Sequence, residues 1–192
     1  MMTDEEYALD SIRKWAWSGF YTIDEARELL EEIVEPDDDV EALRAAIDAS
    51  FAEKLAAEAS WPAQTDCDRL DAVFEALHDD GICALQHAGY TIADGHDDVR
   101  EVVAEEPEGT YHGYCFFHGQ DVEGAIDGDG LAIAFGALGD DPAEGLAVGQ
   151  AVSAALRTAG FAVEWDGSAG QRIALPAIVW QRRIPTEEDD AE

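Results

Sequence analysis

The spacing of apolar residues changes at Trp61-Pro62, and this change constrains the fold more than any other feature of the sequence. Before it, apolar residues recur every three or four positions, as on one face of a helix. After it, short apolar runs typical of strands alternate with helical patterns. The sequence therefore predicts a helical N-terminal arm over residues 1–60, an α+β domain over residues 61–184 and a disordered acidic tail over residues 185–192.

Capping residues and helix-breaking residues set the expected element bounds. Thr22 followed by Glu25 has the form of a capping box, and Pro142 stands where proline favours a helix start. The predicted helices are 4–17, 22–35, 40–59, 66–80, 94–105, 120–126 and 142–158. The predicted strands are 82–87, 111–118, 131–135, 161–165 and 173–181. The expected architecture is a mixed sheet of about five strands with flanking helices, preceded by a small helical unit.

The chain is strongly acidic, with 44 aspartates and glutamates against 11 lysines and arginines and a formal net charge of −33. The acidic residues are spread along the whole chain, as on a solvated surface, and a surface of this charge repels itself at low ionic strength. At ~1 M salt the screening length falls to roughly 3 Å. Because salt would screen the repulsion between these acidic residues, the charge favours adaptation to a salt-rich cytoplasm. The alternative is an acidic protein that mimics nucleic acid or binds a basic partner.

Other features argue against several classes of partner and location. The arginines form no basic stripe, which disfavours nucleic-acid binding. The amino terminus is acidic, and no apolar stretch approaches the ~20 residues of a membrane helix, so we expect a soluble cytoplasmic protein with no membrane partner. Cys67, Cys83 and Cys115 lack metal-site spacing and are expected to be free thiols. The oligomeric state is not readable from the sequence.

Several short blocks occur in a fixed order along residues 61–167. They are Trp61-Pro62, Thr65–Leu70, Ala88–Thr91, Asp94-Gly95, His118–Asp121, Phe135–Leu138 and Val163–Gly167. Together they resemble a family of prokaryotic proteins catalogued only as a domain of unknown function. The resemblance covers roughly residues 60–183. It implies a domain boundary near Trp61 and supplies no activity, substrate or catalytic residue.

Among these blocks, His118-Gly119-Gln120-Asp121 contains the side chains most suggestive of catalysis. An imidazole at the end of a predicted strand would lie beside a carboxylate that could orient it, as in a general base. His87, at the end of another predicted strand, is a third tentative catalytic residue. The alternative is structural: Asp121 caps the short helix after the strand, and His118 is packed or solvated.

The other histidines give little support for a metal site. His112 and His118 share one face of a predicted strand, but six residues at ~3.3 Å each separate them by roughly 20 Å. A site would have to combine His118 or Asp121 with His87, or with His96 and Asp97, from other segments. We therefore expect no metal and no cofactor.

Aromatic residues on the predicted strand 111–118 suggest a place for a ligand. Tyr114 and Phe116 would share one strand face with His112 and His118. If helices leave that face partly uncovered, these side chains form a groove of mixed aromatic and polar character, with His112, Tyr114 and Phe116 as its candidate residues. Aromatic residues in short strands also serve as core, which is the alternative.

Two functions from different classes fit the sequence. The first is a non-enzymatic binding or regulatory module, adapted to high salt, that recognises a protein or a small molecule. The second is a hydrolase-like enzyme that uses His118 and Asp121, with His87, in a cleft at the strand ends. Convergence of the three residues beside a pocket would favour the enzyme, and a buried His118 with satisfied hydrogen bonds would argue against it.

Overall fold

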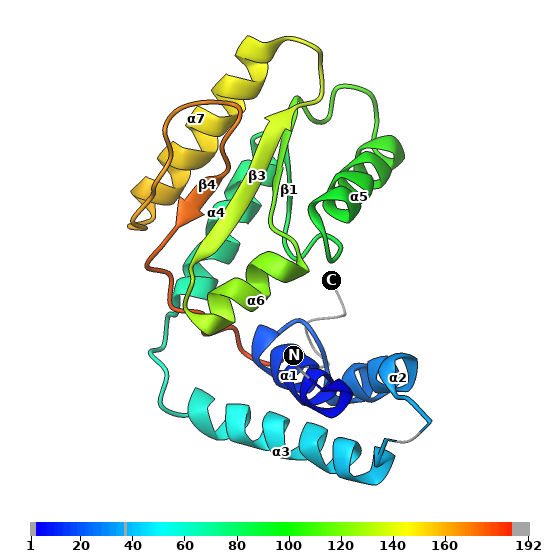
Figure 1. The fold of residues 1–192 in the computed structure, drawn as a ribbon. Helices are drawn as coiled ribbons and strands as arrows, with labels where there is room; N and C mark the ends of the chain where they lie inside the picture. Colours follow the sequence, from blue (N-terminus) through cyan, green and yellow to red (C-terminus); the bar gives the residue numbers. More distant parts are fainter. Residues whose placement is uncertain (1–2, 37, 186–192) are drawn as a thin grey trace. The chain divides into compact units, whose positions relative to one another are not determined.

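The computed structural model describes residues 3–36 and 38–185, and it divides the chain into two compact units. One unit contains the described residues up to Thr65 together with residues 181–185, and the other runs from Asp66 to Trp180. Figure 1 shows the path of the chain through each unit. Residues 186–192 of the predicted tail lie outside the described residues.

The first unit is built from three helices, α1 (Asp4–Ser18), α2 (Ile23–Ile33) and α3 (Val40–Glu58). The capping box predicted at Thr22 and Glu25 is present, and Thr3 with Glu6 forms a second one at α1. The helices pack through small and aliphatic residues at helical spacing. The buried cluster is Ala8, Ile12, Ala16, Ala26, Leu30, Leu43, Ile47 and Phe51.

The second unit is a mixed α+β fold. Its elements are α4 (Asp66–Asp79), β1 (Ile82–Leu85), α5 (Ile92–Glu105), β2 (Gly113–Phe116), α6 (Gly119–Asp127), β3 (Leu131–Ala137), α7 (Pro142–Thr158) and β4 (Ile173–Leu175). The sheet order is β1-β2-β3-β4, with β1 and β2 parallel and the other pairs antiparallel. Among the described residues, no helix is both long enough and apolar enough to cross a membrane.

The predicted fifth strand, 161–165, is not formed. It is reduced to a single bridge between Glu164 and Ala174. The indole of Trp165 donates to the carbonyl oxygens of Ser168 and Gln171, which ties the chain into a local turn in place of a ladder. The predicted strand 173–181 ends at Leu175, because the next residue is a proline without an N–H to donate.

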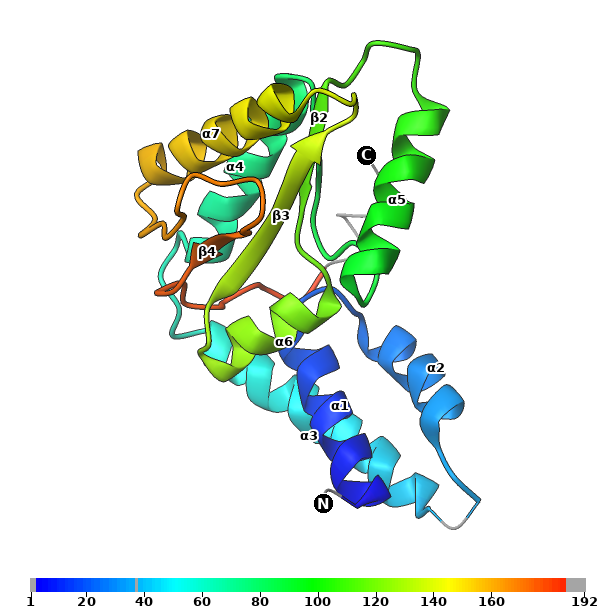
Figure 2. The same ribbon diagram turned by 45° about the horizontal axis from the view of Figure 1, so that its top comes forward.

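The two faces of the sheet are covered by different helices, with α5 on one side and α4 and α7 on the other (Figure 2). Glycines let these helices approach closely. A Cβ at Gly95 in α5 would lie 2.3 Å from the ring of Phe116, and one at Gly149 in α7 would lie 2.5 Å from the ring of Phe135. The rings of Phe116 and Phe135 thus fill the space that a side chain at Gly95 or Gly149 would need.

Candidate functional site

His118 lies two residues after the end of β2 and is the N-cap residue of α6. Its backbone N–H donates to Asp121 Oδ2 at 3.1 Å, and the backbone N–H of Asp121 donates to His118 Nδ1 at 3.4 Å. The two residues thus form a reciprocal capping box in which an imidazole replaces the usual hydroxyl. His118 is 5% exposed and Asp121 is 8% exposed. The spacing of three residues between His118 and Asp121 thus produces a helix cap.

Arg172 completes the cluster from a distant part of the chain. It lies just before β4, and its Nη1 donates to both carboxylate oxygens of Asp121 at 2.8 and 3.0 Å. The same nitrogen lies 3.4 Å from His118 Nε2. The cap therefore also links α6 to the segment that enters β4. Asp121 receives a charge-assisted contact that sequence reasoning missed.

The environment keeps His118 neutral. Burial lowers the pKa of the imidazole, an effect that Asp121 opposes and that the nearby Arg172 reinforces. A neutral ring with its proton on Nε2 fits both contacts with Asp121. Nδ1 then accepts from the backbone N–H, and Nε2 faces Oδ2 at 3.1 Å. Nδ1 is thus engaged within the cap, and Nε2 lies close to the Asp121 carboxylate and to the Arg172 guanidinium.

Three of the short sequence blocks meet at this cap. The backbone N–H groups of Gly119 and Gln120 donate to the carbonyl oxygens of Gly89 and Tyr90. Gly89 has a positive φ of 55°, and a Cβ there would lie 2.3 Å from Asp94 Cβ. The blocks Ala88–Thr91, Asp94-Gly95 and His118–Asp121 are thus explained by one tightly packed junction between the start of α5 and the start of α6.

A capping box also begins α5. The hydrogen bonds from the backbone and the side chain of Thr91 lower the pKa of Asp94. Asp94 is fully exposed, so it remains ionised and caps the helix from the solvent side.

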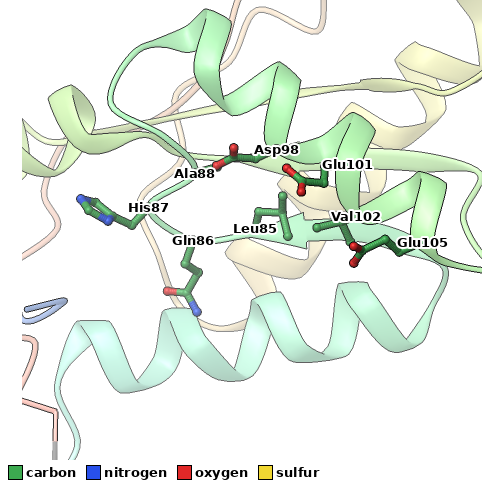
Figure 3. Close-up of a pocket in the computed structure, with 8 residues that line it drawn as sticks. All are labelled: Leu85, Gln86, His87, Ala88, Asp98, Glu101, Val102 and Glu105. Atoms are coloured by element: carbon green, nitrogen blue, oxygen red, sulfur yellow. The ribbon is translucent and has the colours of Figure 1, made fainter. Parts of the chain in front are cut away.

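His87 lies beside a different hollow. Its φ is +53°, in the left-handed region that non-glycine residues seldom adopt. The hollow has a volume of about 290 Å³ and lies between the end of β1 and α5 (Figure 3). Its lining residues are Leu85, Gln86, His87, Ala88, Asp98, Glu101, Val102 and Glu105. Neither His118 nor Asp121 is among them.

The structure brings together two of the three residues of the predicted ligand groove, since the rings of Tyr114 and Phe116 stack with centroids 6.1 Å apart, and it places His112 elsewhere. Phe116 is fully buried against Gly95. Tyr114 is partly exposed and lines a groove of about 640 Å³ between α5 and the end of β3, together with His96, Arg100 and Leu138. His112 lines a second groove of about 350 Å³, and Leu138 lines both grooves.

The groove beside Tyr114 combines aromatic, apolar and charged groups. The ring of His96 stands edge-on to Tyr114 and to Phe116, with centroid distances of 5.4 and 5.1 Å. Burial raises the pKa of the Tyr114 phenol, so its hydroxyl stays protonated. Arg100 pairs with Asp97 at the rim. Such a surface can hold a small ligand by stacking and by hydrogen bonds.

Metal-ligating side chains and thiols are the remaining reactive groups of the described residues. Residues 3–36 and 38–185 contain no group of three or more His, Cys, Asp or Glu side chains placed to hold a metal ion. Cys67, Cys83 and Cys115 form no disulfide with one another, and all three are buried. Burial raises the pKa of Cys83 to about 11 and raises that of Cys115 further, which disfavours the reactive thiolates.

Comparison with known proteins identifies one family. The family model described as "Domain of unknown function (DUF6891)" matches residues 2–184. The match is broader than the resemblance seen in the short blocks, because it includes the three helices of the first unit. Comparisons with curated proteins and with solved structures found no match. The chain therefore belongs to the family of the domain of unknown function DUF6891.

Proposed function

We propose that the protein is a non-enzymatic binding or regulatory module that recognises a small molecule or a protein in a salt-rich cytoplasm. The observation that carries this proposal is the state of His118. A general base needs an imidazole nitrogen free to take a proton from a bound substrate. In His118 both nitrogens face partners within the cap, and the side chain is almost fully buried.

The groove beside Tyr114 is the binding site that this proposal favours. Its volume of about 640 Å³ lies in the range of small-molecule sites. Tyr114 and His96 offer ring faces and polar atoms, while Ala137 and Leu138 offer apolar surface. Leu138 is 39% exposed, which leaves apolar area at the rim for a ligand to cover.

The charge of the chain supports the second part of the proposal. With 44 acidic and 11 basic residues, at least 33 negative charges remain after every base is matched with one acid. Several ion pairs join residues three apart on one helix, such as Asp24 with Arg27 and Asp97 with Arg100. Such exposed pairs stabilise little and leave the overall repulsion in place. A medium of high ionic strength screens that repulsion.

A fragment screen tests the groove. We expect aromatic carboxylic acids of low molecular weight, followed by ¹H–¹⁵N NMR in ~2 M KCl, to shift the amide signals of His96, Tyr114 and Leu138. Ala93 is exposed on α5 and lines the groove, so Ala93→Leu should fill it and weaken fragment binding at least tenfold. Leucine is also a good helix former, which keeps α5 intact.

Ala104→Leu is the matched control, since Ala104 is exposed on the same helix and does not line the groove. It should bind the fragments as the wild type does. Amide shifts that cluster outside the groove, or an equal loss of fragment binding in Ala93→Leu and Ala104→Leu, would show that the groove is not the binding site.

A further inference from the structure

Strand β1 lies at one edge of the sheet, with β2 as its neighbour on the inner side. Ile82 and Cys83 are buried, whereas Ala84, Leu85 and Gln86 are partly exposed. The strand therefore opens to solvent at its carboxyl end. An exposed strand edge presents backbone N–H and C=O groups to which an extended segment of another chain can pair.

A hollow lies on each side of this edge. The first, of about 290 Å³, is lined by Leu85 and Gln86 together with residues of α5. The second, of about 370 Å³, is lined by Ala84 and Gln86 together with residues of α4. Because Gln86 lines both, the two hollows adjoin along the strand. Figure 3 shows Leu85 pointing toward α5 and Gln86 pointing to the opposite side.

The hollows can receive alternate side chains of an added strand. Successive residues of an extended segment point to opposite faces of a sheet. One face would meet the apolar side chains of Leu85 and Val102, and the other would meet Phe74 and Ala84. The free edge and the two hollows thus have the geometry that strand addition requires.

Both hollows have acidic walls. Asp98, Glu101 and Glu105 come from α5, at positions that share one face of that helix. The corresponding residues of α4 are Asp71, Glu75 and Asp79. Within the described residues, Glu75, Asp79, Asp98, Glu101 and Glu105 have no ion-pair partner. These carboxylates stand on both sides of the edge without local compensation.

We propose that an extended, arginine- or lysine-rich segment of a partner protein adds to the sheet at the β1 edge, between α4 and α5. Two adjacent basic residues of the segment point to opposite faces and reach the carboxylates of α5 and of α4. At molar salt the screening length is roughly 3 Å, so the direct ion contacts persist while long-range attraction is lost. Backbone pairing then provides the affinity and the charges provide the choice of partner.

The same carboxylates disfavour a second copy of this chain as the occupant. Pairing of two β1 edges would bring the acidic walls of both copies together, and like charges across an interface are unfavourable. Charged residues beside an open edge also protect it from self-association. A basic segment, in contrast, would be attracted by the carboxylates on both sides of the edge.

The probe is a fluorescein-labelled tetrapeptide, valine-arginine-arginine-valine, whose binding is followed by fluorescence anisotropy in ~1 M KCl. We expect saturable binding to the wild type. The double variant Glu101→Gln with Glu105→Gln should weaken it at least tenfold. Both residues are exposed on α5, and glutamine has a similar helix propensity, so the fold is kept.

Two controls separate this site from general charge attraction. Glu108→Gln with Asp129→Asn removes the same charge from exposed positions outside both hollows and should change the affinity less than twofold. A peptide N-methylated at every residue keeps its charge but cannot form a ladder, so it should not bind. Equal binding of the methylated peptide, or equal loss in the two double variants, would overturn the proposal.

Absence of peptide binding would overturn it too. A wild type that sediments as a dimer and does not bind the peptide would overturn it in favour of a second copy at the edge. The strand edge is distinct from the groove beside Tyr114, and its acidic residues are not among those that line the groove. The fragment screen and the peptide assay can therefore fail independently.

Discussion

Replacing Gly95 with alanine is expected to destabilise the α+β unit by about 2 kcal/mol, within the range of overpacked cores. The new Cβ would lie 2.3 Å from Phe116 Cε2, and the whole Phe116 ring is buried between α5 and the sheet. The ring cannot move away without displacing its neighbours. Urea denaturation followed by circular dichroism at fixed KCl measures the change, since urea adds no ionic strength.

Gly124→Ala is the matched control for this substitution. Gly124 also lies within a helix, α6, but a Cβ there would meet nothing nearer than 3.7 Å. We expect it to stabilise the protein by up to about 1 kcal/mol, because alanine favours the helix over glycine. If Gly95→Ala raised the free energy of unfolding as much as Gly124→Ala does, the result would contradict the close packing of α5 on Phe116.

Salt is expected to stabilise the protein strongly. The net charge of −33 on 192 residues opposes the compact state most where screening is weakest. The screening length shortens from about 10 Å at 0.1 M to about 3 Å at 1 M salt. Thermal unfolding should therefore shift to higher temperature by well over 10 °C between ~0.1 and ~3 M KCl.

The control for the salt series is sucrose at matched osmolality. Sucrose stabilises proteins by exclusion from their surface and does not screen charge. KCl should raise the unfolding midpoint clearly more than sucrose does. A midpoint that stays flat or falls with KCl would contradict the adaptation to high salt.

The helices could be predicted from the sequence because their determinants are local. The predicted helix 142–158 matches α7 at both ends, where Asp141 caps the helix and Pro142 is its first residue. The start of α5 was predicted at Asp94 but lies at Ile92, because Thr91 is the N-cap and Asp94 is the third residue of its capping box. The pattern Thr91-x-x-Asp94 was the signal that would have found it.

The strands could be predicted less well, since their length depends on partners far away in the sequence. Residues 161–165 have the composition of a strand, yet the turn closed by Trp165 leaves only one bridge. The predicted strand 111–118 shortens at both ends to β2, and at its carboxyl end the chain turns at His118 to begin α6. An apolar run alone does not show where its ladder stops.

The site shows the same division between local and distant contacts. The spacing of His118 and Asp121 offered a cap as one of two interpretations, and the capping box is present. The contact of Arg172 with Asp121 joins residues 51 positions apart, and no sequence pattern links them. The pairing of His96 with Tyr114 likewise depends on how α5 lies on the sheet.

The central claim, that His118 serves a binding module as a helix cap and not as a catalytic base, is tested most directly with His118→Asn. Asparagine is a strong N-cap, so α6 should keep its start. Hydrolysis of p-nitrophenyl acetate and p-nitrophenyl phosphate is measured for wild type and variant in ~2 M KCl, after circular dichroism has verified folding. We expect both proteins to match the rate without protein. A wild-type rate above that background that the folded variant loses would contradict the account.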